Sequence, residues 1–294
     1  MKKIALLFLV FFCGIFVLYS QNFSLNGMYS FQEDSLLSIM EINDSNVVFE
    51  YENPPVDKPA EVLNSKIEHL YGMPFIVLSD KLPMEIAVWN TFETQKNIQT
   101  DNKILFIMFE GKTKNIFAYT RGYSEEYRPF NFSRLYERGS LYKDCTSYLI
   151  EEKKYYPIEN LRNLAADTPW VEGVKGDGIG EGFTIEGSCY ENPLGPYLLI
   201  INGFISYEKP YLYKQNNRVK KIKVTGLNSG KTKILDILDT PHPQTVDISF
   251  IKDPEDIRIE IAAVYKGTKY DDTCIHYCIN YDEAVIPYEN SIGE

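Results

Sequence analysis

Long apolar runs, basic residues and histidine are all scarce in this 294-residue sequence. Beyond residue 20 no stretch approaches the roughly 20 consecutive apolar residues of a membrane-spanning helix, so no transmembrane segment is expected there. The 30 Lys and Arg residues are outnumbered by 41 Asp and Glu residues, and the net charge of -11 argues against a general nucleic-acid binder. None of the three histidines lies beside a serine or cysteine nucleophile pattern, so no catalytic residue is predicted from them.

A phosphate-binding loop is also missing, although five glycines fall between Gly173 and Gly182. A P-loop needs its lysine between a strand and a helix, so that backbone N–H groups surround a phosphate. GVKGDGIGEG lacks that lysine and runs into the strand-like FTIE. The GKT triplets at Gly111 and Gly230 open no helix, and Gly226 precedes Gly230 by one residue too few. A dinucleotide site is excluded because no βαβ unit surrounds these glycines.

The first feature that is present is a secretory leader. Two lysines, an apolar run from Ile4 to Leu18 and the small Ser20 precede Gln21. We predict that residues 1–20 are a signal peptide and that the mature protein is secreted, periplasmic or in the outer cell envelope. Lipidation at Cys13 is the alternative, disfavoured because VFFCG has no small residue before the cysteine. Losing the two leader lysines moves the net charge from -11 to -13.

Four cysteines remain after such a cleavage: Cys145, Cys189, Cys274 and Cys278. An oxidising compartment would allow three full pairings, and the sequence does not choose among them. Cys274 and Cys278 lie in TCIHYCINY, which alternates like a strand, so their Cα atoms should be about 13 Å apart, too far for a disulfide. The same alternation puts His276 on their face at distances unsuited to zinc, and no metal site is predicted there.

The N-terminal half consists of short apolar runs between turn formers. No segment from Gly27 to Tyr119 keeps a helical period, with the partial exception of Glu85 to Gln95. The runs are GMYSF, LLSIMEI, NVVFEY, KIEHLY, MPFIVL, ILFIMFEG and NIFAYT. This pattern predicts a small antiparallel β-sheet or barrel. The opening LNGMYSF is similar to that of lipocalin-like barrels, an analogy of fold that carries no site.

A polar, arginine-dotted stretch from Thr120 to Ser140 connects the halves, and its Glu125 and Glu126 are expected to be solvated. The domains predicted are 21–138, β-rich and of unknown function, 139–284, a β-sandwich, and 285–294, a tail. After ENLRNLA, a short helix at most, seven short strands follow: GFTIE, YLLIING, RVKKIKVTG, KTKILDILD, TVDISF, DIRIEIAAVY and CIHYCINY. Such spacing indicates an antiparallel sandwich, so the whole chain is predicted to be all-β.

Three motifs in the second half resemble one known family. They are PWVEGVKGDGIGEGFTIE, LLIINGFISYEKPYLYKQNNRVKKIKV and IRIEIAAVYKGTKYDDTCI. Their order is similar to the NADase-type glycan-binding domain, a branch of the galactose-binding-like (discoidin, F5/8 type C) jelly rolls. The resemblance covers about Tyr142 to Tyr281 and leaves the N-terminal half unrecognised. It implies an eight-stranded sandwich that binds carbohydrate with loops at one end. The catalytic part of the toxin that names the family has no counterpart here.

Residues suited to sugar binding lie in and near these motifs, because a sugar presents hydroxyls and an apolar C–H face. The candidates are Trp170, Glu172, Asp177, Asn202, Tyr207, Asn216, Asn217 and Arg218. Each has a structural alternative. Trp170 could plug the sandwich end, and the asparagines suit turns. Glu172, Asp177 and Glu181 could cap turns or hold a structural cation within the Asp167 to Glu181 loop, although no cofactor is predicted. We expect the glycine-rich rim to face the loop of Asn216, Asn217 and Arg218.

Lys209 to Lys233 holds eight basic residues and no acid. Attraction of an anionic glycan or lipid head group is one interpretation, and a solvated strand face is the favoured one. The sequence as a whole predicts an exported, non-catalytic bacterial protein that binds carbohydrate or another envelope component. The alternatives are a carbohydrate-active hydrolase with two carboxylates at a sugar, and a structural envelope protein without a glycan ligand.

Overall fold

The fold was analysed in a computed structural model. It describes residues 27–33, 36–43, 46–51, 61–70, 73–78, 84–92, 103–110, 113–121, 142–163, 168–189, 192–193, 195–206, 209–282 and 284–287. The predicted leader with Cys13, Glu125 and Glu126 and the candidate Tyr207 lie outside these residues.

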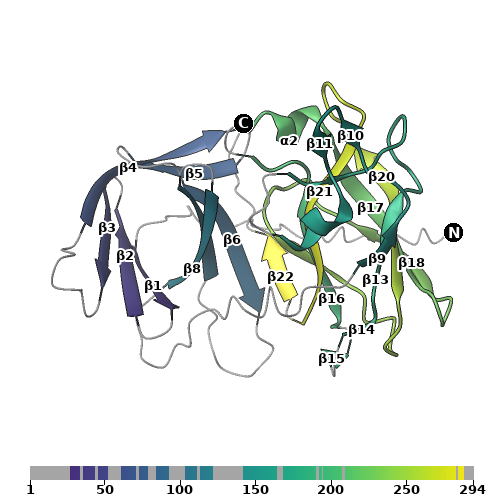
Figure 1. Ribbon diagram of the computed structural model, residues 1–294. Helices are drawn as coiled ribbons and strands as arrows, with labels where there is room; N and C mark the ends of the chain where they lie inside the picture. The colour runs from purple at the N-terminus through teal and green to yellow at the C-terminus, as the bar shows by residue number, and fades with distance from the viewer. Residues whose placement is uncertain are drawn as a thin grey trace, which may run out of the picture.

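Eight antiparallel strands form the N-terminal half (Figure 1). They are β1 (Gly27–Glu33), β2 (Leu36–Ile42), β3 (Asn46–Tyr51), β4 (Glu61–Leu70), β5 (Met73–Leu78), β6 (Met84–Phe92), β7 (Lys103–Glu110) and β8 (Thr113–Arg121). Each strand pairs with the next in sequence, and β8 pairs back to β1, so the sheet closes on itself. This is the barrel alternative of the prediction. The partial helical period that began at Glu85 is overruled, because residues 84–92 form β6.

The last strand of the chain also belongs to this N-terminal sheet. β22 (Ala284–Pro287) pairs antiparallel with the end of β6, from Ala284 opposite Phe92 to Pro287 opposite Trp89. β5 pairs with β6 at only two positions, opposite Met84 and Glu85. β22 therefore occupies a part of the β6 edge that β5 leaves. The sequence had suggested a tail from residue 285, and it contains no signal for this return to the barrel.

The described residues of the second half form a β-sandwich with one short α-helix, α2 (Figure 1). Its elements are β9 (Tyr142–Cys145), β10 (Ile150–Glu151), β11 (Lys154–Tyr155), η1 (Ile158–Arg162), β12 (Trp170–Val171), β13 (Gly182–Ile185), β14 (Ser188–Cys189), β15 (Asn192–Pro193), β16 (Tyr197–Asn202), α2 (Leu212–Gln215), β17 (Asn217–Gly226), β18 (Thr232–Asp236), β19 (Gln244–Asp247), β20 (Ile257–Tyr265) and β21 (Thr273–Tyr281). The all-β prediction is confirmed.

The strands of the sandwich run in the order β19-β16-β21-β17-β20-β13-β9, with β12 added to β21 and β18 to β17. All of these pairings are antiparallel except one. β17 and β21 start side by side and parallel, with Asn217 opposite Thr273 and Arg218 opposite Cys274. The predicted antiparallel sandwich is thus a mixed one, as in a jelly roll. This parallel start brings the first residues of two central strands together at one end of the domain.

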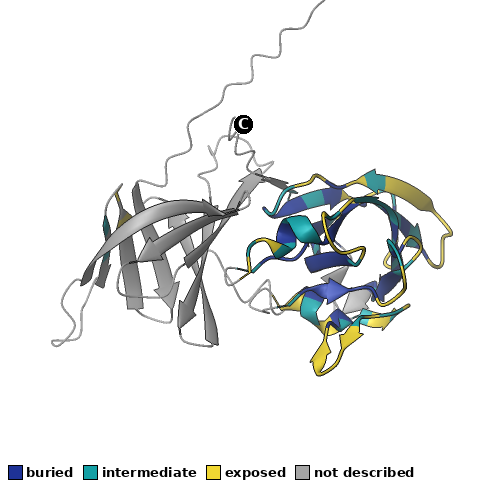
Figure 2. Ribbon diagram, turned by 90° about the horizontal axis from the view of Figure 1, so that it is seen from above, coloured by how far each residue is buried: buried dark blue, intermediate teal, exposed yellow. Residues whose placement is uncertain are grey.

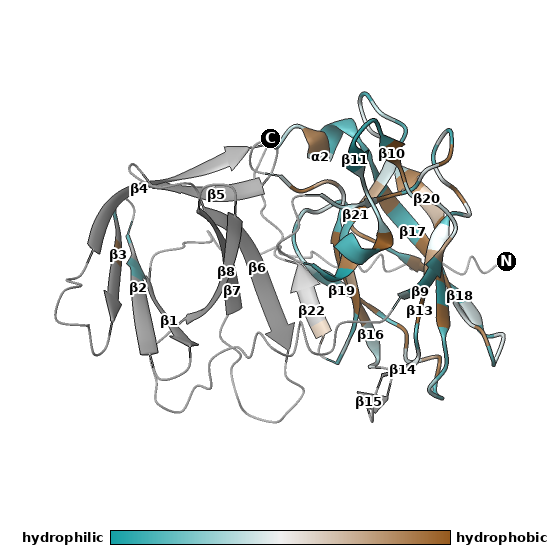
Figure 3. Cartoon of the chain, viewed as in Figure 1, coloured by the Kyte–Doolittle hydropathy of each residue, from teal (hydrophilic) through white to brown (hydrophobic). Residues whose placement is uncertain are grey.

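A large apolar core lies inside the sandwich, with a smaller cluster beside it. Figure 2 shows its buried residues on strands that face one another, and Figure 3 shows hydrophobic residues along the same strands. Trp170 and Phe183 pack edge to face with ring centroids 5.4 Å apart, and Tyr142 packs on Phe183 at 5.9 Å. Burying large aromatic side chains contributes several kcal/mol in total, by rough area arguments. Alternate side chains of β13, β16 and β20 contribute to this core, together with Ile275 and Cys278 of β21.

β21 departs from regular alternation. Ile201 of β16 is opposite Tyr277, whereas the next residue, Asn202, is opposite Ile275, so the register shifts between them. Cys278 consequently packs in the main core, and Cys274 packs in a second cluster with Tyr156, Val171 and Phe204. The expectation that His276 shares one face with both sulfurs is therefore wrong, because a bulge changes the face of a strand.

Cys145, Cys274 and Cys278 are free thiols, so Cys274 and Cys278 do not bond to each other, as predicted. Burial raises the pKa of both the Cys274 and the Cys278 thiol, which keeps them protonated and unreactive.

Candidate functional site

The candidate site is the loop end of the sandwich. We use this name for the β10–β11 hairpin, the glycine loop (residues 172–182), α2 and the β20–β21 loop (residues 266–272). Figure 1 shows α2, β10 and β11 together at one end of the domain, with β14 and β15 at the opposite end. Most of the predicted sugar-binding residues lie on or directly below these segments.

Trp170 lies in the core beneath the loop end. Its side chain is fully buried against Phe183, and its Nε1 donates a hydrogen bond to the backbone oxygen of Ser147 at 3.2 Å. Its indole therefore has no face open to a sugar in this structure. The structural alternative, a plug for the sandwich end, describes its position.

Glu172 fastens the glycine loop to β21. Its buried carboxylate accepts hydrogen bonds from the backbone N–H groups of Val174 at 2.8 Å and Thr273 at 3.1 Å. Burial raises the pKa of Glu172, and the two backbone hydrogen bonds only partly oppose that rise. Gly178 packs against this side chain with φ of +65°, and a Cβ there would lie 2.4 Å from the Glu172 Cγ. Glycine is required at this position by both the backbone angle and the space.

Asp177, at the tip of the glycine loop, meets the start of β17 and the β20–β21 loop. Asn217 donates from Nδ2 to Asp177 Oδ1 at 3.3 Å and to the backbone oxygen of Asp271 at 2.5 Å. Lys266 forms ion pairs with Asp177 and, at 3.3 Å, with Asp271. The glycine-rich rim thus faces Asn217, one of the three residues predicted to lie opposite it, whereas the side chains of Asn216 and Arg218 bond elsewhere.

The carboxylates of this loop are all engaged within the protein. Glu181 accepts a hydrogen bond from Ser147 Oγ at 2.5 Å, and Asp177 pairs with Lys266. Within the described ranges, no group of three or more His, Cys, Asp or Glu side chains is arranged to hold a metal ion. The structural cation considered for this loop has no ligand set among these residues.

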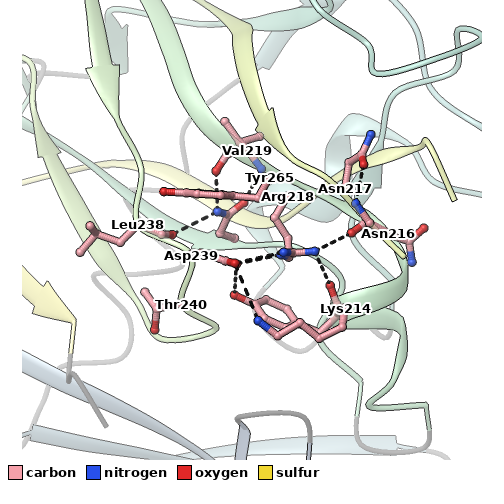
Figure 4. A network of polar contacts seen from close by, with 12 residues as sticks. Lys214, Asn216, Asn217, Arg218, Val219, Leu238, Asp239, Thr240 and Tyr265 are labelled. Atoms are coloured by element: carbon pink, nitrogen blue, oxygen red, sulfur yellow. Dashed lines mark hydrogen bonds and ion pairs between the residues drawn. The ribbon is translucent and has the colours of Figure 1, made fainter. Parts of the chain in front are cut away.

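Arg218 makes the buried ion pair shown in Figure 4. Its Nε and Nη2 donate to the two carboxylate oxygens of Asp239 at 2.7 and 3.0 Å, and its Nη1 donates to the backbone oxygen of Asn216 at 2.9 Å. Tyr213 adds its hydroxyl to Asp239 at 3.1 Å, and Lys214 lies 3.7 Å from the same carboxylate. Burial alone would raise the pKa of Asp239, but the hydrogen bonds and charge of Arg218 outweigh it and lower the pKa below its ordinary value.

Asn202 and Asn216 also bond within the chain. The amide of Asn202 donates to the Val219 oxygen at 2.8 Å and accepts from the Val219 N–H at 2.9 Å, which joins β16 to β17. Asn216 donates from its side chain to the Leu212 oxygen at 2.9 Å, at the end of α2. The structure thus brings Glu172, Asp177 and Asn217 together. The side chains of Asn202, Asn216 and Arg218 instead form hydrogen bonds that stabilise the domain.

Residues 135–279 match the family described as the NAD glycohydrolase translocation F5/8 type C domain. The C-terminal sandwich is an F5/8 type C domain. Neither a curated protein nor a solved structure gives a match. Among the residues that the structure describes, no helix has the length and apolar character needed to cross a membrane. An F5/8 type C domain is a binding module, and the loop end is its candidate binding surface.

Exposed tyrosines, which sequence reasoning missed, mark the loop end of the F5/8 type C domain. Tyr148 is 40% exposed, Tyr155 58%, Tyr211 37% and Tyr270 36%. They come from the β10–β11 region, the turn before α2 and the β20–β21 loop. The only sequence signal was the excess of 22 tyrosines over 17 phenylalanines, which does not say where they lie. Aromatic rings held in water on loops are typical of recognition surfaces.

The basic stretch of the F5/8 type C domain is largely neutralised. Lys221 pairs with Asp236, Lys223 lies 2.8 Å from Glu260, and Arg218 binds Asp239. The ammonium groups of Lys220 and Lys233 lie over the rings of Tyr265 and Phe250. Strand β17 therefore presents a mostly paired, solvated face rather than a strong positive field.

Proposed function

We propose that this is an exported, non-catalytic binding protein whose F5/8 type C domain recognises carbohydrate at its loop end. The observation that carries the proposal is the set of exposed tyrosines at that end: Tyr148, Tyr155, Tyr211 and Tyr270. A tyrosine ring offers a flat face for the C–H groups of a sugar and a hydroxyl for its polar groups. Export rests on the leader predicted at residues 1–20.

Rigid support of the loops strengthens the proposal. Weak sugar contacts give useful affinity only if little conformational entropy is lost on binding. Glu172 ties the glycine loop to β21 through two backbone N–H groups, and Asn217 ties it to the β20–β21 loop. The predicted site residues thus serve recognition by holding the loops in place, and the contacts to a sugar come from the exposed residues above them.

Three carboxylates of the loop end, those of Glu172, Asp177 and Asp271, suit binding better than hydrolysis. A glycoside hydrolase needs two carboxylates on either side of the scissile bond, one of them free to give a proton. Glu172 is fully buried and accepts two backbone hydrogen bonds, and Asp177 and Asp271 share Lys266. None of these three is poised in that way.

The test combines a glycan array with an assay for released reducing sugar. The protein is isolated from its native host, and its N-terminal sequence is expected to start close to Gln21. Tyr155→Ala and Tyr270→Ala should each weaken binding of an array hit by about 2- to 10-fold, the worth of one aromatic contact. Ile234→Ala, which removes an exposed side chain (60%) from β18, is the control and should bind normally.

Each other outcome has a clear meaning. Released sugar would point to the hydrolase, and silence in both assays to a structural protein without a glycan ligand. Binding that is unaffected by both tyrosine substitutions would remove the loop end from the proposal.

A further inference from the structure

The β20–β21 loop is fixed over the end of α2 by consecutive backbone hydrogen bonds. The N–H groups of Lys269 and Tyr270 donate to the Gln215 oxygen at 3.1 and 2.9 Å, and that of Thr268 donates to the Lys214 oxygen at 3.0 Å. A Cβ on Gly267 would lie 2.3 Å from the Gln215 oxygen, so the two segments approach as closely as glycine permits. The side chains at the top of this loop are therefore held by a rigid backbone.

Lys269 stands among tyrosines on this loop. Its ammonium lies 4.7 Å from the centroid of the Tyr270 ring. Tyr211 lies in the turn directly before α2, the helix whose Lys214 and Gln215 oxygens accept the backbone hydrogen bonds of this loop. A hydrogen bond with Tyr270 raises the pKa of Lys269, so the side chain stays positively charged. Both tyrosine residues have more than a third of their surface exposed. The group thus presents one cation and two aromatic rings to solvent.

Lys269 also differs from its neighbours in its charge partners. Lys214 forms an ion pair with Asp239, and Lys266 forms ion pairs with Asp177 and Asp271. Among the described residues no carboxylate forms an ion pair with Lys269. Asp271, which follows Tyr270, forms its ion pair with Lys266 and not with Lys269, and Lys266 also pairs with Asp177. Lys269 is thus a positive charge left uncompensated on the loop end of a strongly acidic chain.

We propose that Tyr211, Lys269 and Tyr270 form a subsite for an acidic sugar residue, one that carries a carboxylate. The ammonium of Lys269 would bind the carboxylate, and a tyrosine ring would pack against the C–H face of the same sugar. This subsite rests on the proposed function and narrows its ligand class. A neutral sugar would leave the Lys269 charge without a partner and gain only the aromatic contact.

The experiment compares acidic glycans with neutral versions of the same chains. An array carries oligosaccharides that contain uronic or sialic acid, each next to its methyl ester, together with neutral glycans. Wild-type protein should bind an acidic member about two- to fivefold more tightly than its ester, the worth of one exposed ion pair. Binding should also weaken as salt is raised, because an exposed charge pair is screened.

Variants then locate the effect. Lys269→Gln should lower the affinity for the acidic glycan about two- to fivefold and leave binding of its ester unchanged, as expected for one exposed ion pair. The control is Lys252→Gln, an exposed lysine in the connection between β19 and β20. Glu255 of that connection contacts Asn228, beyond the far end of β17. Each variant should melt at the wild-type temperature.

The possible failures are distinguishable. If wild-type protein binds only neutral glycans, or if Lys269→Gln behaves like Lys252→Gln, the subsite is wrong and carbohydrate binding stands. If no glycan binds at all, the proposed function fails and the subsite fails with it.

Discussion

At the residue scale, the polar groups that looked most suitable for a ligand are largely occupied by the protein itself. Arg218 is the clearest case, since its guanidinium makes a two-pronged pair with Asp239 and a third bond to the backbone of Asn216. Removing one partner of such a pair leaves a charge that is poorly solvated. A binding defect in an Arg218 variant would therefore need a stability measurement beside it.

We predict that Arg218→Ala lowers the free energy of unfolding by about 1–3 kcal/mol at neutral pH. The estimate lies below that for a fully buried pair because the Asp239 side chain is 28% exposed. The matched control, Arg258→Ala, breaks a pair with the mostly exposed Asp144 and should cost less than about 1 kcal/mol. Urea unfolding of both variants measures the difference, and equal losses would contradict the prediction.

The Asp239 pair also predicts a pH dependence. Arg218 lowers the pKa of Asp239 in the folded protein, so the stabilisation is complete above the ordinary aspartate pKa of about 3.9 and is lost as pH falls through the lowered value. The gap between wild type and Arg218→Ala should therefore be widest at neutral pH and shrink at pH values of about 3 and below. A gap that stays constant on acidification would show that the charge of Asp239 is not involved.

At the scale of elements, the sequence predicts strands that have a local pattern of apolar residues. It does not predict contacts between residues that lie far apart along the chain. Short alternating runs and turn formers predicted most of the strands, and the glycine loop was correctly placed opposite Asn217. The bond from Thr273 to Glu172 spans 101 positions, and the Arg218 to Asp239 pair spans 21, so no local pattern marks them. The bulge in β21 likewise depends on its pairing with β16.

The glycine loop gives a prediction at this scale. Gly178→Ala should cost about 2–4 kcal/mol, because the new Cβ is strained at positive φ and displaces Glu172 from its two backbone hydrogen bonds. Gly180→Ala should cost only about 1 kcal/mol, since its φ is also positive, at +92°, but no atom lies within 4 Å of the new Cβ. Chemical unfolding compares the two. If both variants lose the same free energy of unfolding, the contact between residue 178 and Glu172 does not contribute to stability.

At the scale of the whole molecule, β22 links the end of the chain to the barrel. Strands β9 to β21 supply the sandwich core, whereas β22 pairs with β6. The sandwich should therefore fold as a fragment of residues 140–283, without the last strand. The barrel, in contrast, depends on residues from both ends of the sequence.

We predict that removing residues 284–294 destabilises the barrel by about 1–4 kcal/mol, the worth of four cross-strand pairs, and changes the sandwich much less. The two tryptophans allow each half to be followed separately, because Trp89 lies in β6 and Trp170 in the sandwich core. The Trp170→Phe variant keeps only Trp89, so its fluorescence follows unfolding of the barrel. The Trp89→Phe variant keeps only Trp170, so its fluorescence follows unfolding of the sandwich. If truncation does not change the unfolding midpoint measured by Trp89 fluorescence, β22 contributes nothing to the stability of the barrel.

The pairing of β22 with β6 also sets an order in time. A ribosome delivers the chain from its N-terminus, and domains generally fold as they emerge. Here β6 must wait, with part of its edge unpaired, until the entire sandwich has been synthesised and the final strand arrives. An open strand edge invites pairing with other chains and exposes a protein to degradation. The free part of the β6 edge is thus covered only by a strand synthesised after the sandwich, and a chain that stops before residue 284 leaves that edge open.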